Sequence, residues 1–379
     1  MTTRNPTAAY IYADTMSQHV LREDHPLRPV RLRYTYELLE ALGAFNGKTS
    51  LLVEPRFATV DELLTIHTPG YVDAVKRYSD GGSIQDGAQY GFTAQGDNPV
   101  FPGMYEAALL STGASVQAAE MVADGTVRVA FNSSGGLHHA MAGHASGFCV
   151  FNDPAVAINA LRRRGLRVVY VDIDAHHGDG VQAAFYGDDD VMTISLHESG
   201  RYLFPGTGEV DEVGTGKGRG YSVNVPLFPY TDDDVFLEAF DAVVPPLIDA
   251  FKPDVLATQL GIDTYMTDPL THLALSTTGY VALVRRFSDM GYPWLAFGGG
   301  GYDVDAVARG WALAYGEMVG RQWPDSIPES VRHNLTRDVM RDAAPAPVDP
   351  ELRTRTQAFA KTAVDAIKQG IFPLHGIKS

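Results

Sequence analysis

The segment from Val168 to Val181, which reads VVYVDIDAHHGDGV, constrains the fold more than any other part of the chain. It begins as an uninterrupted apolar run, which is typical of a strand that a sheet buries on both faces. It ends in carboxylates, imidazoles and glycines. Buried charge at this density is costly unless it is paired or binds a metal. The segment therefore predicts a buried strand that runs into a functional site.

Apolar runs of the same kind recur along the chain, and helical stretches lie between most of them. The runs are residues 8–12, 51–53, 127–131, 168–172, 191–196, 221–225, 254–260 and 294–297. This alternation predicts an α/β fold with a mostly parallel sheet of about eight strands and helices on both faces. Because no linker divides the chain, we expect a single three-layer α/β/α domain over 1–379, with its core at about 8–320 and a helical extension at about 321–379.

Composition excludes several classes of protein. A formal net charge of −16 argues against nucleic-acid binding, which calls for a basic face. The single cysteine, Cys149, excludes an intrachain disulfide and a cysteine-cluster zinc site. No apolar stretch is long enough to span a membrane, and Met1–Pro6 does not read as a secretory signal. We therefore expect a protein of the reducing cytoplasm, with neither nucleic acid nor membrane as a partner.

The polar clusters of the chain follow the ends of the predicted strands. They come directly after Phe131, Val171, Leu196, Leu260 and Phe297. Because the carboxyl ends of parallel strands meet at one edge of the sheet, and ligands bind there, these clusters predict one shared site. A long loop over residues 81–103, rich in glycine and polar residues, is expected to border it.

Three residues have the character of a catalytic metal site. Asp174 and His176 occupy alternate positions on the tail of a strand, so their side chains point the same way. An Asp-x-His pair alone is more often a surface ion pair, but Asp263 follows another predicted strand and can supply a third ligand. Three protein ligands and one open position are the usual arrangement of catalytic zinc.

Two adjacent histidines, His138 and His139, follow a glycine turn. An isolated histidine pair is usually structural, but here Asp172 and Asp179 flank the expected ligands without being needed as ligands. Each carboxylate can orient one imidazole and raise its basicity. Two such pairs beside a metal-bound water are suited to metal-assisted hydrolysis.

The glycine run Gly298–Gly301 ends in Tyr302. It is not a phosphate-binding loop, because it lacks the Lys-Ser/Thr ending and the required spacing. The glycines instead allow the backbone to approach a metal closely. Tyr302 can then present a phenol that stabilises a developing oxyanion, although a packed tyrosine is an equally good interpretation of this residue alone.

Together these motifs closely resemble the zinc-dependent histone deacetylases, and most of all their bacterial acetoin-utilisation (AcuC-type) branch. The resemblance runs from about Tyr10 to Val319 and keeps the order of the family's motifs. The segments that carry it are Gly135–Ala140, Ala145–Asp153, Tyr170–Val181, Phe204–Gly208, Gln259–Thr264 and Gly298–Tyr302. Each segment is weak evidence alone, but the complete set is specific.

The resemblance implies an arginase-like fold and zinc-dependent hydrolysis of the N-acetyl amide of acetyl-lysine in proteins, with release of acetate; iron(II) is an alternative metal. It assigns zinc binding to Asp174, His176 and Asp263. It also assigns catalytic roles to His139, the general base oriented by Asp179, and to His138, its electrostatic partner oriented by Asp172. Tyr302 is the third catalytic residue that it implies. Substrate-binding positions are Asp97 at the rim and Gly147, Phe148, Phe204 and Leu270 in a narrow tunnel. Arg31 matches an acetate-exit channel. A structural potassium site matches Asp172, Asp174, His176, Ser195 and Leu196.

Three alternatives remain open at this stage. A deacetylase of acetylated polyamines or other small amines would use the same catalytic residues, although the segment 25–29 resembles the protein deacetylases more. A binuclear manganese ureohydrolase shares the fold, but Gly178 and Tyr265 stand where that family has further metal-binding acids. A non-catalytic acetyl-lysine reader would be expected to have lost a ligand or Tyr302. One departure from the family is Leu137, where many members have an aromatic residue.

Overall fold

The computed structural model describes residues 8–93 and 96–378, so the expectation for Met1–Pro6 lies outside the described residues. Its centre is an eight-stranded sheet of order β2-β1-β3-β8-β7-β4-β5-β6, in which neighbouring strands are parallel. The strands are β1 Ala8–Ile11, β2 Ser50–Val53, β3 Val129–Asn132, β4 Val168–Asp172, β5 Val191–Glu198, β6 Ser222–Leu227, β7 Val255–Gln259 and β8 Trp294–Phe297. The predicted parallel α/β sheet is confirmed.

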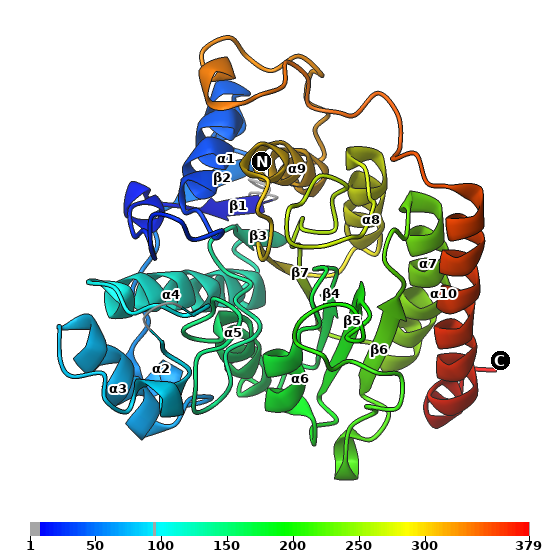
Figure 1. Cartoon of the computed structure of the whole chain (residues 1–379), viewed down its shortest axis with the longest axis horizontal. Helices are drawn as coiled ribbons and strands as arrows, with labels where there is room; N and C mark the ends of the chain where they lie inside the picture. The colour runs from blue at the N-terminus through cyan, green and yellow to red at the C-terminus, as the bar shows by residue number, and fades with distance from the viewer. Residues whose placement is uncertain (1–7, 94–95, 379) are drawn as a thin grey trace, which may run out of the picture.

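Helices cover both faces of this sheet (Figure 1). One layer contains α4 (Met104–Ala123), α5 (Asp153–Arg162) and α6 (Asp179–Phe185), with α2 (Val60–Leu63) and α3 (Pro69–Ser79) outside it. The other contains α1 (Val30–Ala41), α7 (Asp233–Phe251), α8 (Thr277–Asp289), α9 (Val304–Val319) and α10 (Pro350–Gly370). The C-terminal helix α10 lies beside α7 and also contacts β6 (Figure 1).

The core lies between these layers, because the strands present apolar side chains to both. Every residue of β4, β5 and β7 is buried. Trp294 and Trp311 are fully buried, and burying aromatic side chains of this size contributes strongly to core stability. In the described part of the chain, no helix is both long and apolar enough to cross a membrane.

Strand register positions the site. Asp172, the last residue of β4, pairs with Ser195 on β5 and with Gln259 on β7. Gln259 in turn pairs with Phe297 on β8, which pairs with Asn132 on β3. The carboxyl ends of β3, β4, β7 and β8 therefore lie level with one another, while β5 continues for three more residues to Glu198. The loops that follow these strands converge at one edge of the sheet.

Helix α5 does not begin as local capping rules suggest. An aspartate directly before a proline, as in Asp153-Pro154, is typical of an N-cap, but the N-cap is Asn152, whose side chain accepts a hydrogen bond from the N–H of Ala155. Asp153 is the first helical residue. Its carboxylate accepts hydrogen bonds from the N–H groups of Gly136 and Leu137 instead, so a contact distant in sequence replaces the local cap.

Candidate active site and metal centre

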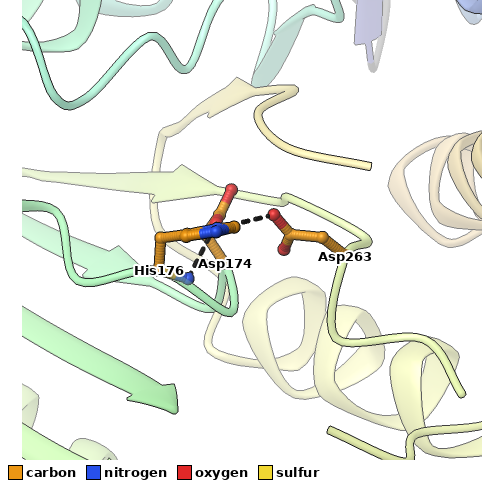
Figure 2. Close-up of side chains that lie close together, drawn as sticks. All are labelled: Asp174, His176 and Asp263. Carbon is orange, nitrogen blue, oxygen red and sulfur yellow. Dashed lines mark hydrogen bonds and ion pairs between the residues drawn. The ribbon is translucent and has the colours of Figure 1, made fainter. Parts of the chain in front are cut away.

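Asp174, His176 and Asp263 converge in the loops after β4 and β7 (Figure 2). The Nδ1 atom of His176 lies 3.0 Å from Oδ1 of Asp174 and 3.0 Å from Oδ2 of Asp263. All three residues are buried, and one ligand atom from each lies within 4.8 Å of the other two. The structure thus assembles the three residues that the sequence suggests as metal ligands into a group that can bind a metal.

The remaining oxygens of this cluster have other partners. Oδ2 of Asp174 accepts hydrogen bonds from Nε2 of Gln259 (2.6 Å) and from the N–H of Gly300 (2.7 Å). Oδ1 of Asp263 accepts one from the N–H of Ala175 (2.8 Å). Each carboxylate therefore directs its other oxygen toward the shared point.

The electrostatics of the cluster fit a cation. Burial, together with the neighbouring Asp174 carboxylate, raises the pKa of Asp263 to about 7. Two buried carboxylates share one imidazole, so the donor set holds more negative charge than the histidine offsets. One nitrogen and two carboxylate oxygens are ligands that suit zinc or iron(II). The residues present therefore fit the metal that the resemblance implies.

His138 forms the first of two carboxylate–histidine pairs. Its Nδ1 donates to Oδ2 of Asp172 at 2.7 Å, and the hydroxyl of Tyr170 donates to the same oxygen. Burial acts to lower the pKa of His138, but the charges of Asp172 and Asp174 prevail and raise it to about 9. His138 therefore carries a positive charge at neutral pH.

His139 forms the second pair, and its charge state is the opposite. Its Nδ1 donates to Oδ1 of Asp179 at 2.7 Å. Burial, and the positive charge on His138, lower the pKa of His139 to about 4. His139 is therefore neutral at neutral pH, as a general base must be.

Tyr302 presents its ring beside the metal cluster, with ring centroids 6.4 Å from His176 and 5.8 Å from Phe148. Burial and the negative charge of Asp263 raise the pKa of its phenol well above the ordinary value, so the hydroxyl remains a donor. Arg31 is buried next to it and donates from Nη1 to the carbonyl oxygen of Gly301 at 3.0 Å.

A small cavity reaches this cluster. Its lining includes Asp174, His176, His138, His139 and Tyr302, together with the expected channel residue Arg31 and the tunnel residues Gly147 and Phe148. A larger, mostly apolar cavity of about 110 Å³ adjoins it and shares Leu27, Arg31, Leu137 and Phe148 with it.

The other expected substrate positions, Phe204, Leu270 and Asp97, are not among the residues that line the two cavities. Phe204 is 43% exposed, and its ring centroid lies 5.0 Å from that of His139. Gly147 leaves no room for a side chain, because a Cβ atom there would lie 2.4 Å from Cδ2 of His139. Leu270 is half-buried in the loop after β7. Asp97 is exposed, and its carbonyl oxygen lies 3.2 Å from Nε2 of His25.

Of the five residues expected at a potassium site, Asp174 and His176 belong to the metal cluster itself. Asp172 and Ser195 are paired in the β4–β5 register, and both are buried, as is Leu196. The hydroxyl of Ser195 lies 2.9 Å from Nδ1 of His197.

Sequence reasoning missed three residues that support the site. Gln259 donates to Asp174, Asn152 donates to the carbonyl oxygens of His138 and Ala140, and Asp153 accepts from the turn before the two histidines. All three residues lie inside the motifs Ala145–Asp153 and Gln259–Thr264, and this position in the sequence was the only signal that could have identified them.

Comparison with known proteins assigns the family. The family model described as the histone deacetylase domain matches residues 25–318. The chain belongs to the histone deacetylase family. The acetoin utilization protein AcuC of Bacillus subtilis (strain 168) is 43% identical over 329 residues, which cover 85% of this chain and 84% of that protein. AcuC of Staphylococcus xylosus is 37% identical over 338 residues, or 87% of each chain.

Solved structures agree with this assignment. A crystal structure of an HDAC homolog complexed with SAHA is 32% identical, with a TM-score of 0.86, and the match covers 95% of this chain and all (100%) of that one. The HDAC homolog from Aquifex aeolicus is also 32% identical, with a TM-score of 0.85 and coverage of 94% and 100%. The resemblance to the deacetylases and the arginase-like fold are both confirmed, and the chain is an AcuC-like hydrolase of the deacetylase family.

Proposed function

We propose that this histone deacetylase family member is a zinc-dependent amidohydrolase that removes acetyl groups from lysine side chains of proteins and releases acetate. One observation carries the proposal. A single cavity is lined by two of the three clustered metal-ligand candidates, by both histidines of the carboxylate–histidine pairs, and by Tyr302. The two candidates in its lining are Asp174 and His176, and the third, Asp263, belongs to the same cluster. A metal, a base and an oxyanion donor are the groups that amide hydrolysis requires.

The roles of the chain's own residues follow from their geometry. Asp174, His176 and Asp263 would hold the zinc ion, which when bound polarises a carbonyl and activates a water molecule. His139, neutral and oriented by Asp179, accepts the proton of the water at Nε2 and later donates it to the departing lysine amine.

The two remaining groups, His138 and Tyr302, stabilise the negative charge that develops during the reaction. The imidazolium of His138, held by Asp172, places a positive charge beside the reacting atoms. The phenol of Tyr302 donates a hydrogen bond to the developing oxyanion.

Iron(II) is the alternative metal, because the same donor set suits it. A structural potassium ion near Asp172, Asp174, His176, Ser195 and Leu196 is part of the proposal, on the strength of the resemblance.

The substrate is proposed from the residues at the entrance. Phe148 and Phe204 would contact the acetyl-lysine stem, with Leu270 as a third wall. The exposed carboxylate of Asp97 would accept hydrogen bonds from the backbone amides of a peptide. Acetylated polyamines and other small N-acetyl amines are the second candidate, because the same catalytic groups would hydrolyse them.

The test compares turnover of an acetyl-lysine peptide with that of N-acetylputrescine by the purified protein, with acetate as the measured product. We expect the peptide to be the better substrate by kcat/KM. Preference for the polyamine would favour the second candidate, and release of acetate from neither would overturn the proposal.

Metal analysis separates the deacetylase from a binuclear manganese ureohydrolase. Within residues 8–93 and 96–378, the only other group of potential metal ligands is Asp188–Asp190, which is not part of the cavity. We expect one zinc or iron per chain at the catalytic cluster. Two manganese ions per chain would contradict the deacetylase proposal.

A further inference from the structure

His177 follows the metal-ligand candidate His176 and has no part in the chemistry proposed above, yet it is 1% exposed and both of its ring nitrogens have partners. Its Nδ1 lies 2.8 Å from the hydroxyl of Thr207, and its Nε2 lies 3.1 Å from Oε1 of Gln182. The first partner belongs to the loop that carries Phe204, and the second to helix α6. His177 therefore joins that loop to the buried framework.

The surrounding hydrogen bonds determine which nitrogen of His177 carries the proton. Glu212 accepts from the N–H groups of Gly208 and Glu209 through Oε1, and from Nε2 of Gln182 through Oε2. The amide oxygen of Gln182 must then face His177, which requires an N–H donor at Nε2 of the histidine. In the neutral ring Nδ1 is left as an acceptor, and the hydroxyl of Thr207 donates to it.

The framework end of this network is firmly held. The amide oxygen of Gln182 also accepts hydrogen bonds from Oγ of Ser222 (2.8 Å) and Nδ2 of Asn224 (2.7 Å), and both residues are buried on β6. A buried amide with every partner in place is costly to displace. The position of His177 is thus fixed from the sheet.

The loop end is held against the ring of His177. A Cβ atom at Gly208 would lie 2.7 Å from Cγ of His177 and 2.4 Å from Nε2 of His197, so the backbone touches both rings. The carbonyl oxygen of Gly208 accepts from His197. Phe204, by contrast, is 43% exposed, and its ring lies near those of the site histidines His139 and His176. Its place at the entrance depends on the loop backbone.

We propose that His177 is a positioning residue: through Thr207 it holds the loop 204–209, and so sets where Phe204 stands at the mouth of the active site. This inference rests on the proposed function, because Phe204 is taken to contact the substrate stem. Loosening the loop should weaken substrate binding and raise KM, while the groups that perform the chemistry, which lie on other loops, keep their geometry and kcat.

The test uses a matched pair of variants at an exposed position. Thr207→Val replaces the hydroxyl with a methyl group, and Thr207→Ser retains the hydroxyl. We expect Thr207→Val to raise KM for an acetyl-lysine peptide roughly three- to tenfold, the value of one hydrogen bond, with kcat changed less than twofold. Thr207→Ser should restore the wild-type KM. Equal KM values in all three proteins, or a fall in kcat at constant KM, would overturn the proposal.

Limited trypsin digestion gives a second measurement that needs no enzymatic activity. Arg201 lies three residues before Phe204, and its side chain is 64% exposed. Cleavage after Arg201 should be faster in Thr207→Val than in wild type and Thr207→Ser, at an unchanged melting temperature. Acceleration at all cleavage sites with a lower melting temperature would indicate a general structural role and overturn the proposal.

The two measurements also separate this inference from the proposed function. If the wild-type protein releases no acetate from acetyl-lysine, the deacetylase proposal fails. Faster cleavage after Arg201 in Thr207→Val alone would still support the anchoring of the loop by His177, and unchanged cleavage would overturn that as well.

Discussion

The Nε2 atoms of His138 and His139 lie 3.0 Å apart. Nδ1 of His138 donates to Asp172, and Nδ1 of His139 donates to Asp179. The Nε2 atoms of the two rings therefore face each other. The carboxylates of Asp172 and Asp174 favour the residence of the Nε2 proton on His138, so Nε2 of His139 is left unprotonated and can act as a base. Two adjacent residues of one type thereby acquire different charges.

This difference predicts that His139 is the base. His139→Ala should lower kcat on an acetyl-lysine peptide by roughly 10²- to 10⁴-fold, the usual contribution of a general base, without loss of bound metal. The measurement is steady-state kinetics with metal analysis. The exposed His333→Ala is the matched control and should behave as wild type. A His139→Ala enzyme within a few-fold of wild type would contradict the assignment.

Removal of one ligand should empty the metal site. Asp263→Ala leaves His176 with Asp174 alone, and two ligands do not retain a catalytic metal. We expect loss of both bound zinc and activity, measured by elemental analysis after dialysis. Asp189→Ala, which removes a carboxylate from the separate acidic group, should retain both. Activity in metal-free protein would be incompatible with the proposed mechanism.

Tyr302→Phe should separate chemistry from metal binding. The variant loses the hydroxyl that donates to the oxyanion but keeps the ring that packs beside His176 and Phe148. We expect kcat to fall roughly 10²-fold or more, with unchanged metal content and melting temperature. Tyr202→Phe, which changes an exposed tyrosine, is the control. A reduction of only a few-fold would remove Tyr302 from the mechanism.

Gly147 should not tolerate even one methyl group. The added Cβ of Gly147→Ala would lie 2.4 Å from the ring of His139, and the backbone has a φ of +50°. Displacement of the base by about 1 Å is expected to lower kcat/KM by roughly 10²-fold. In Gly143→Ala the nearest atom is 3.9 Å away, so this variant should keep full activity. Similar activity of both variants would show that the His139 loop moves freely.

Stability should depend on pH through His67. Burial lowers the pKa of this histidine to about 4, and its Nε2 accepts a hydrogen bond from the N–H of Asn152. Between about pH 6.5 and pH 4 the unfolded chain binds a proton at this residue that the folded chain does not, so stability falls as the pH falls, by up to about 3 kcal/mol.

The variant His67→Gln isolates this contribution. It should be less stable than wild type at pH 7, and the difference in the free energy of unfolding should shrink as the pH falls toward 4. Chemical denaturation at several pH values measures both quantities. A difference that stays constant over this range would exclude His67 as the cause.

The parallel sheet and most of its elements could be predicted from sequence because their causes are local. Apolar runs of strand length and amphipathic helices can be recognised by their spacing, and β8 begins and ends at the bounds of the run 294–297. The N-cap of α5, by contrast, could not be identified from the sequence. Asp153 is a good cap by local rules, but its carboxylate is used by the turn at Gly136, which lies far away in the sequence.

By itself, the sequence determined the chemical types present and their place at the carboxyl ends of the strands, because parallel strands bring those ends to one edge. Only the tertiary structure decided which groups act on which. The charges of His138 and His139 depend on how near each lies to buried carboxylates, and electrostatic energy depends on distance and burial rather than on sequence separation. His177 had no visible partner in the sequence, because Thr207 and Gln182 reach it only once the chain is folded.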